Sequence, residues 1–128
     1  ETVFHRAFDV SPDPLMALEQ LIDLGVTRVL TSGQAASALA GADLIHQLVV
    51  KAGSRIEILP GGGITPDNVA ELVQRTAVQQ VHASCSGWTV DSSTQARPSL
   101  RFGPADGPPD RVRVLDGMWV RALRESLP

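Results

Sequence analysis

Histidine, arginine and aspartate stand close together near the start of the chain, in the hexapeptide Phe-His-Arg-Ala-Phe-Asp that ends at Asp9. Imidazole and carboxylate groups move protons in enzymes, and Arg6 carries a permanent charge that binds carboxylate or phosphate. The pattern predicts an anion clamp with an acid–base pair, in which His5, Arg6 and Asp9 are the candidate catalytic residues. A structural network of the same residues is the alternative, because buried charges must be paired.

Three consecutive glycines, Gly61, Gly62 and Gly63, lie between an apolar run and a helix that we expect to open near Thr65. Successive backbone N–H groups in such a loop point toward an anion, and the dipole of the following helix adds to the attraction. The loop is neither a Walker motif nor GxGxxG. We predict an anion-binding loop here, with a purely conformational role for the glycines as the alternative.

Ser32 and Gly33 follow another β-branched run that ends at Thr31. The hydroxyl groups can donate hydrogen bonds to an oxyanion, and the glycine has no side chain to keep it away. Ser32 and Gly33 are therefore candidate anion-binding residues. A serine–glycine turn with no ligand explains the same residues.

Cys85 is the only cysteine, so the chain has no internal disulfide and no CxxC pair. On an extended strand, His82 and Cys85 point to opposite faces, so one metal ion could bind both only if the strand broke at Ser84. They are weak candidate metal ligands, and a buried, inert cysteine is the alternative.

Short β-branched runs alternate with amphipathic helices through the first 85 residues. Asp13 and Pro14 mark the start of the first helix and Gly25 its end, a second helix is expected over 42–52, and Thr65 opens the third. The four predicted strands are 2–8, 27–31, 55–59 and 79–84. This alternation predicts an α/β fold with a parallel sheet. A small doubly wound sheet and half of an eight-stranded barrel both fit the spacing.

Composition excludes several classes of protein. The 128 residues carry a net charge of −3 and their arginines are spread along the chain, so the sequence has no basic cluster that would indicate binding of nucleic acid. No apolar run approaches the roughly 20 residues that span a bilayer, which argues against a membrane protein and for a cytoplasmic one. Gly, Ser and Pro dominate residues 87–109, where we expect a long loop, and a helical pattern returns from residue 110.

The fragments FHRAFD, LTSG, LPGGGI and VHAS occur in this order, and LGVTRVLTSG is an especially specific stretch. Together they resemble the C-terminal half of the CutC copper-homeostasis family. The resemblance implies a TIM (βα)8 barrel, of which residues 1–86 are βα units five to eight, a half barrel. Residues 87–109 are then a Gly/Pro/Ser-rich loop, and residues 110–128 a C-terminal helix packed on the barrel.

The resemblance implies a cytoplasmic protein of copper homeostasis that binds copper, expected as Cu(I). An alternative is a TIM-barrel enzyme that acts on a small phosphorylated or carboxylated anion at the barrel mouth. A half barrel that acts only through association is a third hypothesis. The anion-binding candidates carried over by motif are Arg6, Ser32, Gly33, Gly61, Gly62, Gly63, His82 and Ser84.

The chain opens with Glu1 and enters a β-favouring run at once, so we expect an N-terminal part to be missing. A half barrel has unpaired strand edges and an uncovered inner face. We therefore expect either a homo-oligomer, in which two copies complete the ring, or a missing N-terminal half of the barrel. The expected ligand is a small anion or a copper ion.

Overall fold

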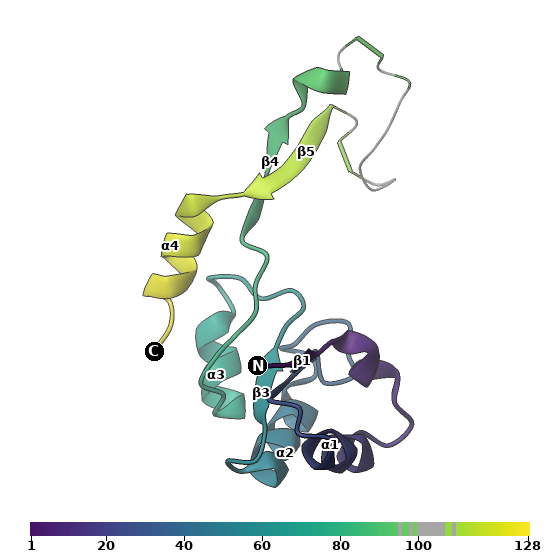
Figure 1. Ribbon diagram of the computed structural model, residues 1–128. Helices are drawn as coiled ribbons and strands as arrows, with labels where there is room; N and C mark the ends of the chain where they lie inside the picture. Colours follow the sequence, from purple (N-terminus) through teal and green to yellow (C-terminus); the bar gives the residue numbers. More distant parts are fainter. Residues whose placement is uncertain (95, 98, 100–106, 109) are drawn as a thin grey trace.

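A parallel three-stranded sheet forms the centre of the computed structural model, which describes residues 1–94, 96, 97, 99, 107, 108 and 110–128. The strands β1 (Val3–Phe4), β2 (Arg28–Thr31) and β3 (Glu57–Pro60) lie side by side in chain order. The parallel register pairs Phe4 with Val29 and Val29 with Ile58. The predicted α/β class with a parallel sheet is confirmed (Figure 1).

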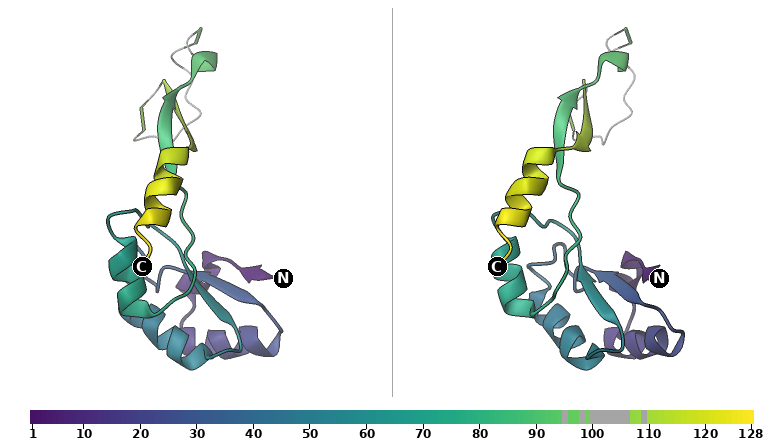
Figure 2. Two further views of the ribbon diagram at one scale, coloured as in Figure 1. Left: turned by 90° about the vertical axis from the view of Figure 1, so that its left-hand side faces the viewer. Right: turned by 60° about the vertical axis from the view of Figure 1, so that its left-hand side comes forward.

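Helices cover one face of this sheet. They are α1 (Pro14–Asp23), α2 (Ala42–Ala52) and α3 (Val69–Thr76), which form an arc along the outside of the strands (Figure 2). Val29 and Ile58 point toward the helices and are buried, whereas their neighbours Leu30 and Leu59 on the opposite face remain partly exposed. The hydrophobic core therefore lies between the sheet and its helices.

The helix ends follow the predicted signals for α1 and α2. Asp13 caps α1, because its Oδ1 accepts the N–H groups of Leu15 at 3.0 Å and Met16 at 2.9 Å. Gly25 follows with φ +72°, a conformation that favours glycine. The predicted bounds of α2 are those observed.

The third helix starts later than predicted, at Val69. The Thr65 N–H donates to Asn68 Oδ1 at 2.9 Å. This hydrogen bond closes a turn over residues 65–68, which precedes the helix.

The first and last predicted strands are shorter than expected. β1 ends at Phe4, because His5 Nδ1 accepts the Ala7 N–H at 3.0 Å and caps a 3-10 helix, η1 (Arg6–Val10). The predicted strand over 79–84 is reduced to one bridge, between Gly61 and His82, in which the His82 N–H donates to the Pro60 carbonyl at 2.8 Å.

A β-hairpin replaces the start of the predicted loop and the first residues of the predicted C-terminal helix. β4 (Ser86–Val90) pairs antiparallel with β5 (Arg111–Leu115), and Trp88 lies opposite Arg113. The predicted loop over 87–109 is therefore wrong at its start, where β4 and the 3-10 helix η2 (Ser92–Thr94) stand. Of that loop, residues 95, 98, 100–106 and 109 lie outside the described residues.

The last helix, α4 (Gly117–Glu125), begins seven residues later than predicted because Asp116 Oδ1 caps it through the Met118 N–H at 2.9 Å. The preceding Arg-Val-Arg-Val alternation is a strand pattern with period two. The hairpin extends away from the sheet, while Leu123 of α4 is buried with the core residues (Figure 1). Within the described part of the chain, no helix is long and apolar enough to cross a membrane.

Candidate functional site

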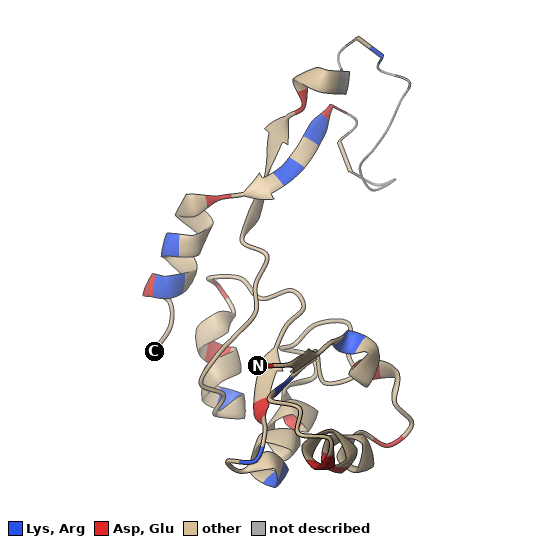
Figure 3. Cartoon of the chain, viewed as in Figure 1, with Lys and Arg blue, Asp and Glu red and all other residues tan. Residues whose placement is uncertain are grey.

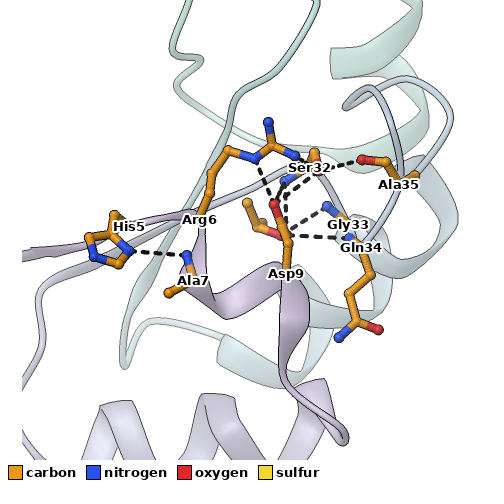
Figure 4. Close-up of polar contacts among 9 residues, drawn as sticks. His5, Arg6, Ala7, Asp9, Ser32, Gly33, Gln34 and Ala35 are labelled. Atoms are coloured by element: carbon orange, nitrogen blue, oxygen red, sulfur yellow. Dashed lines mark hydrogen bonds and ion pairs between the residues drawn. The ribbon is translucent and has the colours of Figure 1, made fainter.

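Asp9 forms the centre of a hydrogen-bond network at the carboxyl end of β2. Its Oδ1 accepts the Thr31 hydroxyl, the Ser32 N–H at 3.1 Å and the Gln34 N–H at 3.3 Å. Its Oδ2 accepts Arg6 Nε at 2.7 Å and lies 3.0 Å from Ser32 Oγ (Figure 4). Both oxygens of this carboxylate therefore accept hydrogen bonds from more than one donor.

Burial raises the pKa of Asp9, but the hydrogen bonds from Thr31, Arg6 and Ser32 outweigh it and hold the pKa below its ordinary value. The group is therefore a carboxylate at neutral pH and a poor proton acceptor. This geometry agrees with the alternative expected for Asp9 from the sequence, a structural network of paired charges. Its chemical effect is to orient Arg6.

Arg6 turns one edge of its guanidinium toward this network and leaves another edge free. Nε donates to Asp9, and Nη2 donates to Ser32 Oγ at 2.6 Å. Nη1 makes no hydrogen bond within the described part of the chain and faces Gly62, where an added Cβ would lie 3.3 Å from it. The arginine is thus fixed on one side and able to bind an anion on the other.

The turn at Ser32 and Gly33 supports the network rather than presenting free donors. The Ser32 N–H is bonded to Asp9, and the Gly33 N–H donates to Thr31 Oγ1 at 2.8 Å. Gly33 has φ +69°, and an added Cβ would lie 2.3 Å from the Gly41 carbonyl oxygen. The backbone N–H groups of this turn are therefore engaged within the protein.

A pocket of about 400 Å³ lies at the carboxyl ends of the strands, and we call it the mouth pocket. It brings together Arg6, the glycine loop, His82 and Ser84 from the predicted anion-binding set, and Cys85 from the predicted metal pair, whereas Ser32 and Gly33 do not line it. The described residues that line it are Arg6, Leu30, Gly61, Gly62, Gly63, Ile64, Thr65, His82, Ala83, Ser84, Cys85, Ser86, Arg113 and Trp119.

His5 does not join this group. Its Nδ1 is occupied by the Ala7 N–H, its ring lies 5.4 Å from the Phe4 ring, and it points away from Asp9 (Figure 4). His5 is exposed and is absent from the lining of the mouth pocket. His82 is the imidazole that the fold brings to the pocket.

Cys85 is buried on the wall of the mouth pocket, at the turn from the bridge residue His82 into β4. Its φ of +42° breaks the extended course of the chain, so His82 and Cys85 line the same pocket, unlike two residues of one regular strand. Among the described residues, no group of three or more His, Cys, Asp or Glu side chains could hold a metal ion. His82 and Cys85 are therefore a candidate ligand pair to which the described residues add no third His, Cys, Asp or Glu side chain.

Arg113 and Trp119 were missed by the sequence reasoning. The sequence placed both on the C-terminal helix. The structure keeps Trp119 on that helix, α4, but places Arg113 on β5. The alternating Arg-Val-Arg-Val run was the signal for a strand, but nothing local indicates that the strand folds back over the pocket.

Comparison with known proteins gives consistent results. Residues 1–87 match the model of the CutC family. A family protein CutC from Treponema denticola is 53% identical over 125 residues, which cover 98% of this chain and 49% of that protein. One from Pasteurella multocida is 54% identical over 124 residues, covering 97% and 50%. The chain therefore spans about half the length of the curated relatives it matches.

A solved structure is similar as well. It is the crystal structure of the "Putative Copper Homeostasis Protein CutC" from Streptococcus agalactiae, with a TM-score of 0.59 and 42% sequence identity. The match covers 62% of this chain and 40% of that chain.

Proposed function

Because the chain belongs to the CutC family, we propose that it acts in copper homeostasis, the role printed in the name of the Streptococcus agalactiae relative. The expected location is the cytoplasm. We place the activity of the whole protein at the barrel mouth, because active sites of parallel α/β folds lie at the carboxyl ends of the strands.

The proposed architecture is the second half of a TIM barrel, formed by residues 1–86. Two features support it over a doubly wound sheet. Helices α1 to α3 cover one face of the sheet, whereas a doubly wound sheet carries helices on both faces. The strands also follow chain order through the Gly61–His82 bridge with no reversal. The remaining strands come from an N-terminal half or from a second copy in a homo-oligomer.

The molecular activity that the geometry supports best is binding of a small phosphorylated or carboxylated anion in the mouth pocket. The observation that carries it is the free Nη1 of Arg6 beside Gly62, in a pocket whose described lining contains no Asp or Glu. Gly61 to Gly63 leave room for a ligand, and Thr65 and Ser84 supply hydroxyl groups. In an enzyme built on this site, His82 is the group able to move a proton.

Calorimetric titration with inorganic phosphate tests this proposal. Arg6→Gln should weaken binding at least about tenfold, because the charge-assisted hydrogen bond is lost. Arg75→Gln is the matched control, since Arg75 is an exposed arginine on α3 outside the pocket. Equal binding by wild type and Arg6→Gln would refute the proposal, and far-UV circular dichroism checks that both variants are folded.

Copper is the second candidate, as a Cu(I) cargo. Cys85 and His82 line one pocket, and thiolate and imidazole are ligands that Cu(I) accepts. Such a site has two ligands from the described part of the chain. Competition with a Cu(I) chelator should show weaker binding by Cys85→Ser and by His82→Gln, and unchanged binding by His46→Gln, which alters an exposed histidine on α2. Unchanged binding by all three variants would refute a copper site here.

A further inference from the structure

The mouth pocket is completed by the C-terminal part of the chain. Arg113 of β5 and Trp119 of α4 line it, and both lie beyond the residues that match the family model. The remaining lining residues come from η1, β2, the segments between β3 and β4, and Ser86 at the start of β4. The pocket is thus enclosed by two parts of the chain that are far apart in sequence.

Arg113 is a second cation in this pocket. It forms no ion pair within the described part of the chain, and its guanidinium carbon lies 5.6 Å from the centroid of the Trp88 ring. A guanidinium held over an aromatic face keeps the hydrogen-bond donors in its own plane available. Figure 3 shows the basic segments of β5 on the hairpin.

The two arginines reach the pocket from different elements. Arg6 comes from η1 and is fixed by Asp9 and Ser32, whereas Arg113 comes from the hairpin. No carboxylate from the described residues lines the pocket between them. A second cation without a protein counter-charge is favourable when a ligand supplies the negative charge.

We propose that Arg113 forms a second anion-binding position, so that the ligand is a small organic molecule with two anionic groups. One group binds Arg6 and the glycine loop, the other binds Arg113, and the carbon skeleton lies against Trp119. A pocket of about 400 Å³ suits a molecule of this class. This inference rests on the proposed anion-binding function and specifies its substrate class.

Two probes separate one anionic position from two: inorganic phosphate, and 2-phosphoglycolate, which carries a phosphate and a carboxylate. By calorimetry, the wild type should bind 2-phosphoglycolate at least about tenfold more tightly than phosphate. Arg113→Gln should remove this difference and leave phosphate binding unchanged. Arg113→Lys should restore part of it.

Arg111→Gln is the matched control, because Arg111 lies on the same strand and does not line the pocket. It should bind both probes as the wild type does. Equal affinity of the wild type for the two probes, or no effect of Arg113→Gln, would overturn the inference while phosphate binding preserved the proposed function. Absence of phosphate binding by the wild type would overturn both.

Discussion

Asp9 determines which way Arg6 faces. The carboxylate is nearly buried, with 9% of its side chain exposed, while the Arg6 side chain is 45% exposed. One salt bridge therefore joins the interior of the βα unit to the mouth pocket. A positive charge that is fixed before a ligand arrives costs less to order on binding.

Asp9→Asn should lower the free energy of unfolding by about 2 kcal/mol, because the Arg6 guanidinium loses its counter-charge and several donors lose a charged acceptor. Asp43→Asn is the control, since Asp43 pairs with Arg75 through a carboxylate that is 90% exposed. Its effect should be below about 0.5 kcal/mol. Urea unfolding measures both values, and equal effects would contradict the role assigned to Asp9.

Stability should also depend on pH through Asp9. Burial opposes ionisation, but hydrogen bonds from Thr31, Arg6 and Ser32 place the folded-state pKa below the ordinary 3.8. The unfolded state then binds more protons between the two pKa values, so this contribution is complete above 3.8 and is lost as pH falls through the folded pKa.

Urea titrations at a series of acidic pH values measure this contribution. The wild type should lose more unfolding free energy than Asp9→Asn as pH falls. Glu19, whose pKa Arg55 and Lys51 lower to about 2, contributes the same trend to both proteins and cancels in the difference. Parallel pH curves for the two proteins would disagree with the low pKa of Asp9.

The family resemblance grouped Arg6, the glycine loop, His82 and Ser84, which the structure brings to one pocket, but it also included Ser32 and Gly33, which do not line that pocket. It could not place His5. The chain turns into η1 after Phe4 as Phe8 is buried and Asp9 bonds to Ser32, a residue 23 positions away. A hydrogen bond between residues so far apart cannot be inferred from the local sequence, and the alternation of residues up to Asp9 is typical of a strand.

At the scale of the elements, the close approach of Gly33 to Gly41 holds the β2 turn against the start of α2. Gly33→Ala should lower the unfolding free energy by about 3 kcal/mol, since a Cβ adds a backbone collision to an unfavourable positive φ. Gly25→Ala has the same kind of φ with nothing within 4 Å, so it should cost only about 1 kcal/mol. Thermal unfolding compares the two, and similar losses would contradict the importance of the contact.

Elements with local end signals could be predicted, and those that depend on a distant partner could not. Asp13 and Gly25 delimit α1 because capping is decided within one turn. β5 has no such signal, since it depends on pairing with β4, more than 20 residues earlier. The sequence also allows a helix here, because a helical spacing fits Val112, Leu115 and Trp119. That interpretation conflicts with the period-two alternation of β5, which is the pattern found in the hairpin.

For the whole molecule, the outer edge of β1 is the exposed side of the parallel sheet. Val3 is 50% exposed and Phe4 37%, and unpaired strand edges favour pairing with another chain. We predict that the molar mass in light scattering rises with protein concentration.

Phe4→Glu should reduce this association, because a charge on an edge strand opposes pairing. Val10→Glu is the control, since Val10 is 83% exposed on η1 and lies outside the sheet. A constant monomer mass for the wild type would contradict association through this edge.

The most direct test of the anion site is a titration of the ¹⁵N-labelled protein with inorganic phosphate, followed by nuclear magnetic resonance. The account predicts that the backbone amide signals of Gly62 and Gly63 and the Nε signal of Arg6 shift together and saturate, and that Arg6→Gln abolishes the glycine shifts. Shifts confined to other parts of the chain, or none at all, would contradict an anion site in the mouth pocket.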